Sequence, residues 1–189
     1  MEFMMEEINV LRKFRGIPNI AQLAGLVISE NPYKPNPCTK RPTVVTGFLV
    51  EYYPGGILQQ TSENRDEVDA DLPMRWTVQI GRALEPMHEN GHAHLDMKRE
   101  NVVLDAENRA IRNSSHRKPM RFLKAMKYLL LICLLGARVA TDCWAYGRVL
   151  LALAEKFGSG NLRLVAEQLT KMEATERISL CDSLEKLEG

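Results

Sequence analysis

Four polar residues of different chemical types lie within a single eight-residue stretch: His94, Asp96, Lys98 and Asn101. A carboxylate such as that of Asp96 can accept or orient the proton of a hydroxyl group. An ammonium such as that of Lys98 can offset negative charge on a group in transfer, and a carboxamide such as that of Asn101 can help hold a metal ion. A tight loop can aim all three at one point, so this stretch is a candidate site for chemistry on a hydroxyl group.

The segments on either side would hold such a loop in place. Residues 72–90 predict a long amphipathic helix, with Pro73 in its first turn. After the loop, Val102–Leu104 and Ala110–Ile111 predict a small β-hairpin. A loop anchored between a helix and a hairpin favours a functional site over a chance group of polar residues that follows a helix.

The remaining periodicity predicts more helix than strand. Residues 31–42 contain four prolines and predict a loop, and residues 61–71 predict a polar linker or a short helix. The other predicted elements are helices at 6–14, 122–135, 141–157, 162–172 and 179–187, and strands at 23–29 and 44–53.

Composition and charge narrow the class of protein. The 189 residues are 45% hydrophobic and include 25 Lys+Arg against 24 Asp+Glu, for a net charge of +1, which gives no indication of nucleic-acid or anionic-membrane binding. The four cysteines form no C-x-x-C pair, which favours reduced thiols over zinc or disulfides. The longest apolar run, residues 128–135, is shorter than the about 20 residues of a membrane span, and a buried helix is favoured there. The N-terminus does not read as a secretory signal, so an intracellular, cytoplasmic protein is expected.

The stretch from His94 to Asn101 resembles the catalytic loop of serine/threonine protein kinases, H-R-D-L-x-x-x-N with a lysine two residues after the aspartate. All four polar residues match at the family's spacing. The resemblance implies that Asp96 is the catalytic base, that Lys98 contacts the phosphoryl group and that Asn101 binds Mg²⁺ on the ATP phosphates. It also implies a structural, packed role for His94.

Four further segments resemble family motifs in the family's order. Residues 7–20 resemble the helix called αC and the turn after it, with Glu7 as the ion-pairing glutamate. Residues 48–56 resemble the hinge that holds adenine, which would make Val50 the gatekeeper and place the backbone of Glu51, Tyr52 and Tyr53 against the base. Asp142–Gly147 resembles the D-x-W-x-x-G start of helix αF, whose aspartate hydrogen-bonds the catalytic-loop backbone, and Glu176–Leu180 resembles E-R-P-S.

The resemblance also breaks in several places. The chain begins at αC, so Glu7 has no V-A-I-K lysine to pair with, and no glycine-rich loop precedes it. The position of the D-F-G aspartate falls at Ser114–His116, where a serine would be a poor Mg²⁺ ligand. No A-P-E follows, which leaves Arg177 without its usual glutamate, and αG has little room. Residues 112–140 stand in place of the activation segment, and our hypothesis is altered splicing or a gene-model error there. In the loop itself, Leu95 and Arg99 replace the family's arginine and proline.

Several single residues have a structural interpretation beside the functional one. We interpret His88, His92 and His116 as surface residues, and Asp142 as structural rather than catalytic. Trp76 and Trp144 are predicted to be core residues.

The resemblance implies an α+β, protein-kinase-like fold, present here as a partial domain over residues 1–189. A truncated N-lobe with αC, about two strands and the hinge (1–56) would rest on a mainly helical C-lobe (57–189). The implied function is serine/threonine phosphotransfer that uses ATP and Mg²⁺, impaired or absent in this chain. The alternatives are a pseudokinase-like module that binds a protein partner, and a non-functional fragment. A protein substrate or protein partner is expected, with no nucleic acid and no membrane span; the oligomeric state is left open.

Overall fold

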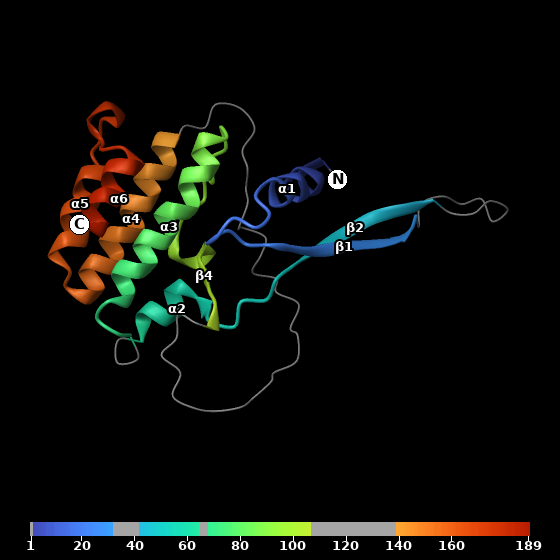
Figure 1. The fold of residues 1–189 in the computed structure, drawn as a ribbon, viewed down its shortest axis with the longest axis horizontal. Helices are drawn as coiled ribbons and strands as arrows, with labels where there is room; N and C mark the ends of the chain where they lie inside the picture. The colour runs from blue at the N-terminus through green and yellow to red at the C-terminus, as the bar shows by residue number, and fades with distance from the viewer. Residues whose placement is uncertain (1, 32–41, 65–67, 107–138) are drawn as a thin grey trace. The chain divides into compact units, whose positions relative to one another are not determined.

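The computed structural model describes residues 2–31, 42–64, 68–106 and 139–189, and the chain divides into two compact units, residues 1–52 and 53–189. The described elements combine helices with two small antiparallel sheets (Figure 1), which confirms the predicted α+β class. Within these ranges, no helix is both long and apolar enough to cross a membrane.

The first unit contains one helix and one pair of strands. Helix α1 (Glu2–Lys13) is amphipathic: Ile8 and Leu11 are three residues apart on one side and are each only 2% exposed. Strands β1 (Leu23–Glu30) and β2 (Thr43–Val50) pair antiparallel, with Leu26 opposite Phe48 and irregularities on either side.

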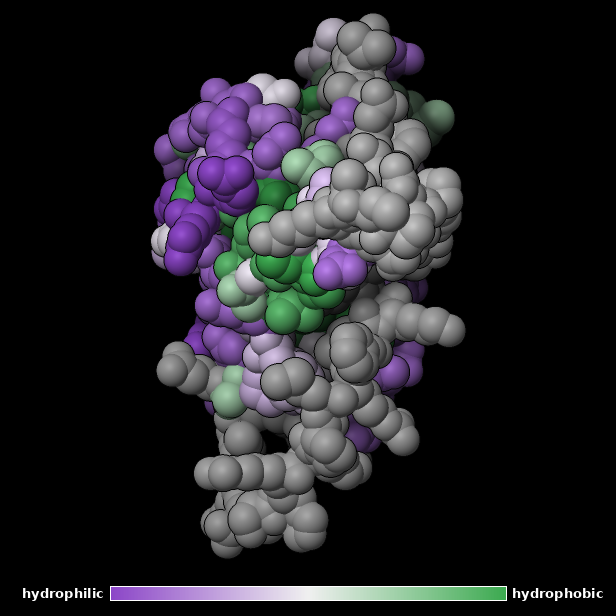
Figure 2. Space-filling model, turned by 90° about the vertical axis from the view of Figure 1, so that its right-hand side faces the viewer, coloured by the Kyte–Doolittle hydropathy of each residue, from purple (hydrophilic) through white to green (hydrophobic). Residues whose placement is uncertain are grey.

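The β1–β2 pair buries none of its own side chains fully. Every residue of both strands is exposed or half-buried, and Ile28 is 62% exposed. Exposed apolar side chains occur on both strands, at Leu26, Val27, Ile28 and Leu49. Figure 2 shows a face of the molecule on which hydrophobic residues lie open beside strongly hydrophilic ones. A two-stranded pair of this kind has little stability of its own.

The second unit is mainly helical, and helices α3, α4, α5 and α6 lie side by side (Figure 1). Strand β3 comes before α3 in sequence and strand β4 comes after it. The two pair antiparallel as a second two-stranded sheet, with Gly56 opposite Leu104. The elements in chain order are β3 (Gly56–Ile57), α2 (Leu58–Glu63), α3 (Leu72–Glu89), the 3-10 turn η2 (Arg99–Asn101), β4 (Val103–Leu104), α4 (Val139–Phe157), α5 (Gly160–Leu169), the 3-10 turn η5 (Ala174–Glu176) and α6 (Leu180–Glu188).

The helices of the second unit share one apolar core. Trp76 of α3 is 1% exposed and meets the ring of Phe157 of α4 edge to face, with the ring centroids 6.4 Å apart. The phenol of Tyr146 is buried and donates to the Thr77 carbonyl at 2.8 Å, and burial raises the pKa of Tyr146. At Gly81 an added Cβ would lie 2.6 Å from a methyl carbon of Leu184 and 2.9 Å from the Tyr146 hydroxyl, so a larger residue would force these buried side chains to shift. This core fixes α3 relative to α4, the two helices that flank the candidate site.

Most predicted elements in the described ranges are confirmed, with shifted ends. The strand predicted to end at Tyr53 ends at Val50, and β4 pairs with β3, which precedes the loop in sequence. Trp144 is 39% exposed, so the prediction that it is a core residue was wrong; it lies off the buried side of α4, and Arg148 lies over its ring, 5.8 Å from the centroid. Predicted features at 32–41, 110–111, 112–138 and 122–135 lie outside the described residues.

Candidate active site

The candidate loop begins where helix α3 ends. Gly91 has a positive φ of 74° and donates its N–H to the His88 carbonyl at 3.0 Å, while the N–H of His92 reaches the Met87 carbonyl at 2.9 Å. This pair of bonds is a Schellman ending, which satisfies the last helical carbonyls and requires a left-handed residue, here glycine. The loop therefore leaves the helix in a direction set by local sequence.

The three predicted catalytic-loop side chains meet at Asp96. The ammonium of Lys98 lies 2.9 Å from Asp96 Oδ1, and Asn101 Nδ2 donates to Asp96 Oδ2 at 2.9 Å. The same Asn101 nitrogen also reaches the Asp96 main-chain carbonyl at 2.7 Å. Asn101 is buried and ends the 3-10 turn η2, and its carboxamide holds both the backbone and the side chain of Asp96.

The ionisation of Asp96 follows from these contacts. Partial burial works against the charged form, but the hydrogen bonds from Lys98 and Asn101 and the charge of Lys98 outweigh it and lower the pKa of the carboxyl below its ordinary value. Asp96 is thus a carboxylate over the physiological range, with one oxygen on a cation and the other on an amide. This arrangement can accept a hydrogen bond or a proton from a hydroxyl group near the loop.

Asp142, at the start of α4, anchors the loop through hydrogen bonds to its backbone. Its carboxylate is fully buried and accepts the backbone N–H of His94 at 2.6 Å and that of Leu95 at 2.7 Å. Leu95 has a positive φ of 63°, a conformation that is uncommon for a side chain of its type, and the two hydrogen bonds hold it there. The hydrogen bonds predicted from Asp142 to the loop backbone are therefore confirmed, as is its structural position. His94 is also buried, as predicted.

His88 supplies a third hydrogen bond to Asp142 that sequence reasoning missed. Its side chain is 9% exposed and its Nε2 lies 3.0 Å from Asp142 Oδ2, so the prediction of a surface histidine was wrong. The physical reason is helical periodicity: His88 follows the buried Leu84 by four residues and so falls on the side of α3 that faces α4. That spacing was visible in the sequence. Because Asp142 holds a lowered pKa, Nε2 acts as the donor in this bond.

The pKa of Asp142 results from opposing effects. Burial favours the neutral carboxyl, while the hydrogen bonds from His88 and from the N–H groups of His94 and Leu95 favour the carboxylate and lower the pKa. A buried carboxylate that accepts three hydrogen bonds is a stable anchor, because each of its two oxygens has a donor.

Arg177 lies near the same end of α4. Its guanidinium donates to the carbonyls of Lys171 at 2.7 Å, Ala140 at 2.9 Å and Met172 at 3.0 Å. The residue therefore ties the segment before η5 to the first turn of α4. Backbone oxygens satisfy the guanidinium in place of the glutamate that the kinase pattern leads one to expect.

The four residues predicted to hold adenine span the boundary between the two units in sequence. Val50 ends β2 opposite Leu23, and the Glu51 N–H donates to the Gln22 carbonyl at 3.0 Å. Tyr52 is 65% exposed and is the last residue of the first unit, while Tyr53 begins the second. The structure therefore orders the start of this segment, and its contact with adenine stays a prediction.

Glu7, the predicted ion-pairing residue of the first helix, is half-buried on α1. Burial raises the pKa of its carboxyl. Among the described residues, no lysine or arginine forms an ion pair with it.

The described oxygen donors do not amount to a complete magnesium site. Mg²⁺ prefers octahedral coordination with carboxylate oxygens. Asp96 and Asn101 converge, but nowhere in the described ranges do three or more His, Cys, Asp or Glu side chains group as metal ligands. Residues 114–116, at the position where the family places its metal-binding aspartate, lie outside the described ranges.

Comparison with known proteins places the chain in a family. The protein kinase domain model matches residues 2–114, more than half of the chain, and the chain therefore belongs to the protein kinase domain family. Similar proteins include the serine/threonine-protein kinase ppk25 of Schizosaccharomyces pombe, 36% identical over 75 residues, which are 40% of this chain and 18% of that protein. The hormonally up-regulated neu tumor-associated kinase of Mus musculus is 31% identical over 91 residues, 48% of this chain and 11% of that protein. The chain thus spans less than a fifth of the length of these relatives.

Proposed function

We propose that this chain is built for ATP-dependent phosphotransfer to a serine or threonine hydroxyl of a protein, with an activity that is impaired or absent. The observation that carries the proposal is the convergence of Lys98 and Asn101 on the carboxylate of Asp96. The anchoring of the loop by the buried Asp142 supports it, because the geometry is held by packing rather than by chance contact.

In this proposal Asp96 orients the substrate hydroxyl and accepts its proton. Lys98 balances negative charge on the phosphoryl group as it moves, and Asn101 keeps Asp96 in place and offers its carboxamide oxygen to the metal. ATP with Mg²⁺ would supply the phosphoryl group, and Val50, Glu51, Tyr52 and Tyr53 would contact the adenine. The chain's own residues thus position and deprotonate the hydroxyl.

A second candidate is a pseudokinase-like module that binds a protein partner without efficient phosphotransfer. Serine at the position of the D-F-G aspartate favours it, since a hydroxyl is a weaker Mg²⁺ ligand than a carboxylate. Loss of that ligand would remove much of the electrostatic stabilisation on which phosphoryl transfer depends.

Phosphotransfer from labelled ATP to a serine/threonine peptide library, with Mg²⁺, separates the two candidates. If Asp96 is the base, Asp96→Asn should lower the rate by at least about 100-fold. The exposed Asp69→Asn serves as the matched control and should leave the rate unchanged. Equal rates for wild type and Asp96→Asn would exclude Asp96 chemistry. A thermal shift with ATP and Mg²⁺ in the absence of transfer would favour the binding module.

A further inference from the structure

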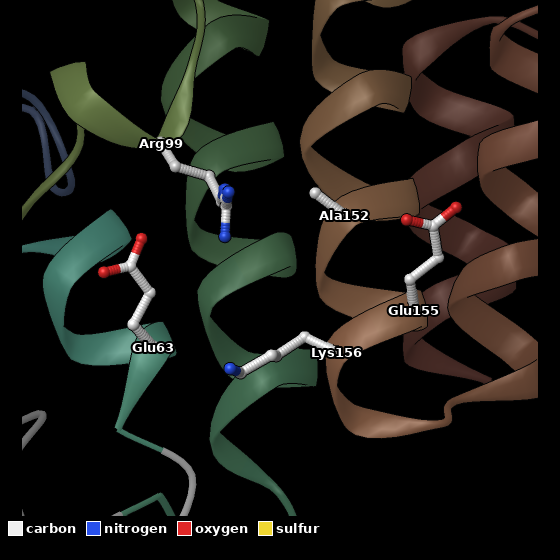
Figure 3. Close-up of a pocket in the computed structure, with 5 residues that line it drawn as sticks. All are labelled: Glu63, Arg99, Ala152, Glu155 and Lys156. Atoms are coloured by element: carbon white, nitrogen blue, oxygen red, sulfur yellow. The ribbon is translucent and has the colours of Figure 1, made fainter.

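A hollow of about 380 Å³ lies in the second unit beside the catalytic loop. Its lining comes from three elements: Glu63 from α2, Arg99 from η2, and Ala152, Glu155 and Lys156 from α4 (Figure 3). Four of these five residues are charged, which is unusual for a small-molecule pocket, where apolar side chains normally dominate.

The charged groups around the hollow carry no hydrogen-bonded ion pair with one another in the described residues. Arg99 donates to the hydroxyl of the buried Ser62 at 3.3 Å, which fixes its direction. In the part of the chain that the structure describes, no ion pair joins Arg99 or Lys156 to Glu63 or Glu155. The two cations are therefore available to a ligand.

The side chains differ in where they point. Figure 3 shows Arg99 and Lys156 reaching from opposite ends of the hollow into the space between α2 and α4, whereas the Glu155 carboxylate projects from the other side of α4. The hollow thus presents two cations, with Glu63 as the remaining carboxylate at its α2 wall. Two like charges that face one space favour an anion between them, and charge-assisted hydrogen bonds to an anionic oxygen are the strong kind.

The hollow is close to the proposed base. Arg99 follows Asp96 by three residues, so their Cα atoms are at most about 11 Å apart. An extended peptide advances about 3.3 Å per residue. A peptide whose hydroxyl lay at Asp96 therefore has the length to reach the hollow with a residue about three positions away.

We propose that Arg99 and Lys156 form a subsite for an anionic side chain of a bound peptide, about three residues from the hydroxyl presented to Asp96. The anionic group is a carboxylate or a phosphoryl group, the two sources of anionic oxygen in a peptide. The placement of the hydroxyl rests on the proposed function, whereas the binding of the anion does not. Glu63 opposes the anion and limits its affinity.

The test measures peptide binding by fluorescence anisotropy, without nucleotide. The probes are fluorescein-labelled alanine-rich peptides with one central serine and, three positions before or after it, an aspartate, a phosphoserine or an asparagine. In one of the two placements, the aspartate peptide should bind about tenfold more tightly than the asparagine peptide, the size expected for one charge-assisted contact. A phosphoserine peptide that binds more tightly than the aspartate peptide identifies phosphoryl as the preferred group, and one that binds less tightly identifies carboxylate.

Matched variants locate the effect. Arg99→Gln combined with Lys156→Gln should abolish the preference, while Arg163→Gln, an exposed arginine of α5, should retain it. Glu63→Gln should tighten binding of the aspartate peptide, and Glu155→Gln should not change it. Folding of each variant is checked by circular dichroism. Equal binding of the aspartate and asparagine peptides, or a preference that survives the double substitution, would overturn the subsite.

The two proposals fail separately. Phosphotransfer that shows no preference for acidic peptides would overturn the subsite and leave the proposed function standing. Anion-selective peptide binding without any phosphotransfer would overturn phosphotransfer as the function of this chain and leave the subsite standing. Raising the ionic strength should shrink the preference, because the contacts are partly exposed charges; a preference that is insensitive to salt contradicts the proposal.

Discussion

The two units of this chain bury their apolar residues to different extents. In residues 53–189, four helices pack around a common core in which Leu150, Leu153 and Leu162 are fully buried. In residues 1–52, the helix buries one side, yet none of the strand residues is buried, and Ile28 is 62% exposed. The same proportion of apolar sequence gives a closed core in one unit and an open strand pair in the other.

This difference shows where the catalytic-loop geometry comes from. The loop contacts described above, made by Asp142, His88, Lys98 and Asn101, lie inside the second unit. The second unit therefore holds the loop by its own packing. Substitutions in each unit test this contrast.

The largest expected effect is the truncation of a core leucine in the second unit. Leu150→Ala removes a fully buried side chain and should destabilise the protein by about 2–5 kcal/mol. Ile28→Ala, in the exposed strand pair, should change the free energy of unfolding by no more than about 0.5 kcal/mol. Urea denaturation followed by far-ultraviolet circular dichroism measures both. Similar losses from the two substitutions would contradict the contrast, and a broad, uncooperative wild-type transition would favour a poorly folding fragment.

The next largest effect is expected at the anchor of the loop. Asp142→Asn replaces a charged acceptor of three hydrogen bonds, and each bond to a charged group contributes about 1.5–3 kcal/mol, so a loss of about 3 kcal/mol is expected. The exposed Asp71→Asn, whose side chain makes no cap hydrogen bond, should cost little in the same denaturation experiment. Equal losses would remove Asp142 from the proposed role.

Asp142 also gives the second unit a pH dependence. Its folded-state pKa is lowered, so its contribution to stability is present above the pKa of the unfolded chain and is lost as the pH falls through the folded-state value. Thermal melts of wild type should therefore lose stability on acidification below about pH 4, the ordinary range of an aspartate. Asp142→Asn should show a shallower loss over the same range, and an unchanged slope would argue against the linkage.

A smaller effect is expected at His88. His88→Phe keeps the ring but removes the donor to Asp142, and should cost about 1–2 kcal/mol. His88→Gln keeps an N–H donor at a similar reach and should restore part of that loss. The readout specific to the loop is the backbone amide resonances of His94 and Leu95 in a ¹⁵N spectrum. If both variants shift them equally, the hydrogen bond to Asp142 is not what orients the loop.

The smallest effect is expected at Glu7 in the first unit. Burial raises its folded-state pKa, so the neutral carboxyl stabilises the folded state. This contribution to stability is lost as the pH rises through the folded-state pKa. Glu7→Gln should therefore protect the α1 amides from hydrogen exchange at neutral pH, after correction for intrinsic rates. Glu30→Gln, at the exposed end of β1, is the control. Reduced protection in Glu7→Gln would mean that the carboxylate has a favourable partner.

Local sequence predicted the parts that depend on neighbours in the chain. The period of apolar residues predicted α3 and α4 nearly in full. Gly91, just after α3, adopts the positive φ that the end of this helix requires. The spacing of Asp96, Lys98 and Asn101 within one loop gave their convergence. Periodicity also contained the position of His88, four residues after Leu84, although it was interpreted as a surface residue.

Other features depended on contacts between distant segments. Trp144 has the size of a core residue, yet it lies off the buried side of α4 and is partly exposed. The pairing of β4 with β3, which comes before α3 in sequence, brings together segments more than forty residues apart. Neither could be read from a window of adjacent residues, because burial and strand pairing depend on which surfaces meet.

Sequence alone predicted the order of the helices, the polar residues of the loop and the kinase family, since these depend on local periodicity and on residue types at fixed spacing. Tertiary structure alone decided that His88 joins Asp142, that Arg177 binds three carbonyls and that Arg99 and Lys156 face one hollow. The first two of these bring groups from different helices or turns within hydrogen-bonding distance. Such distances are set by the packing of the shared core, which no local pattern specifies.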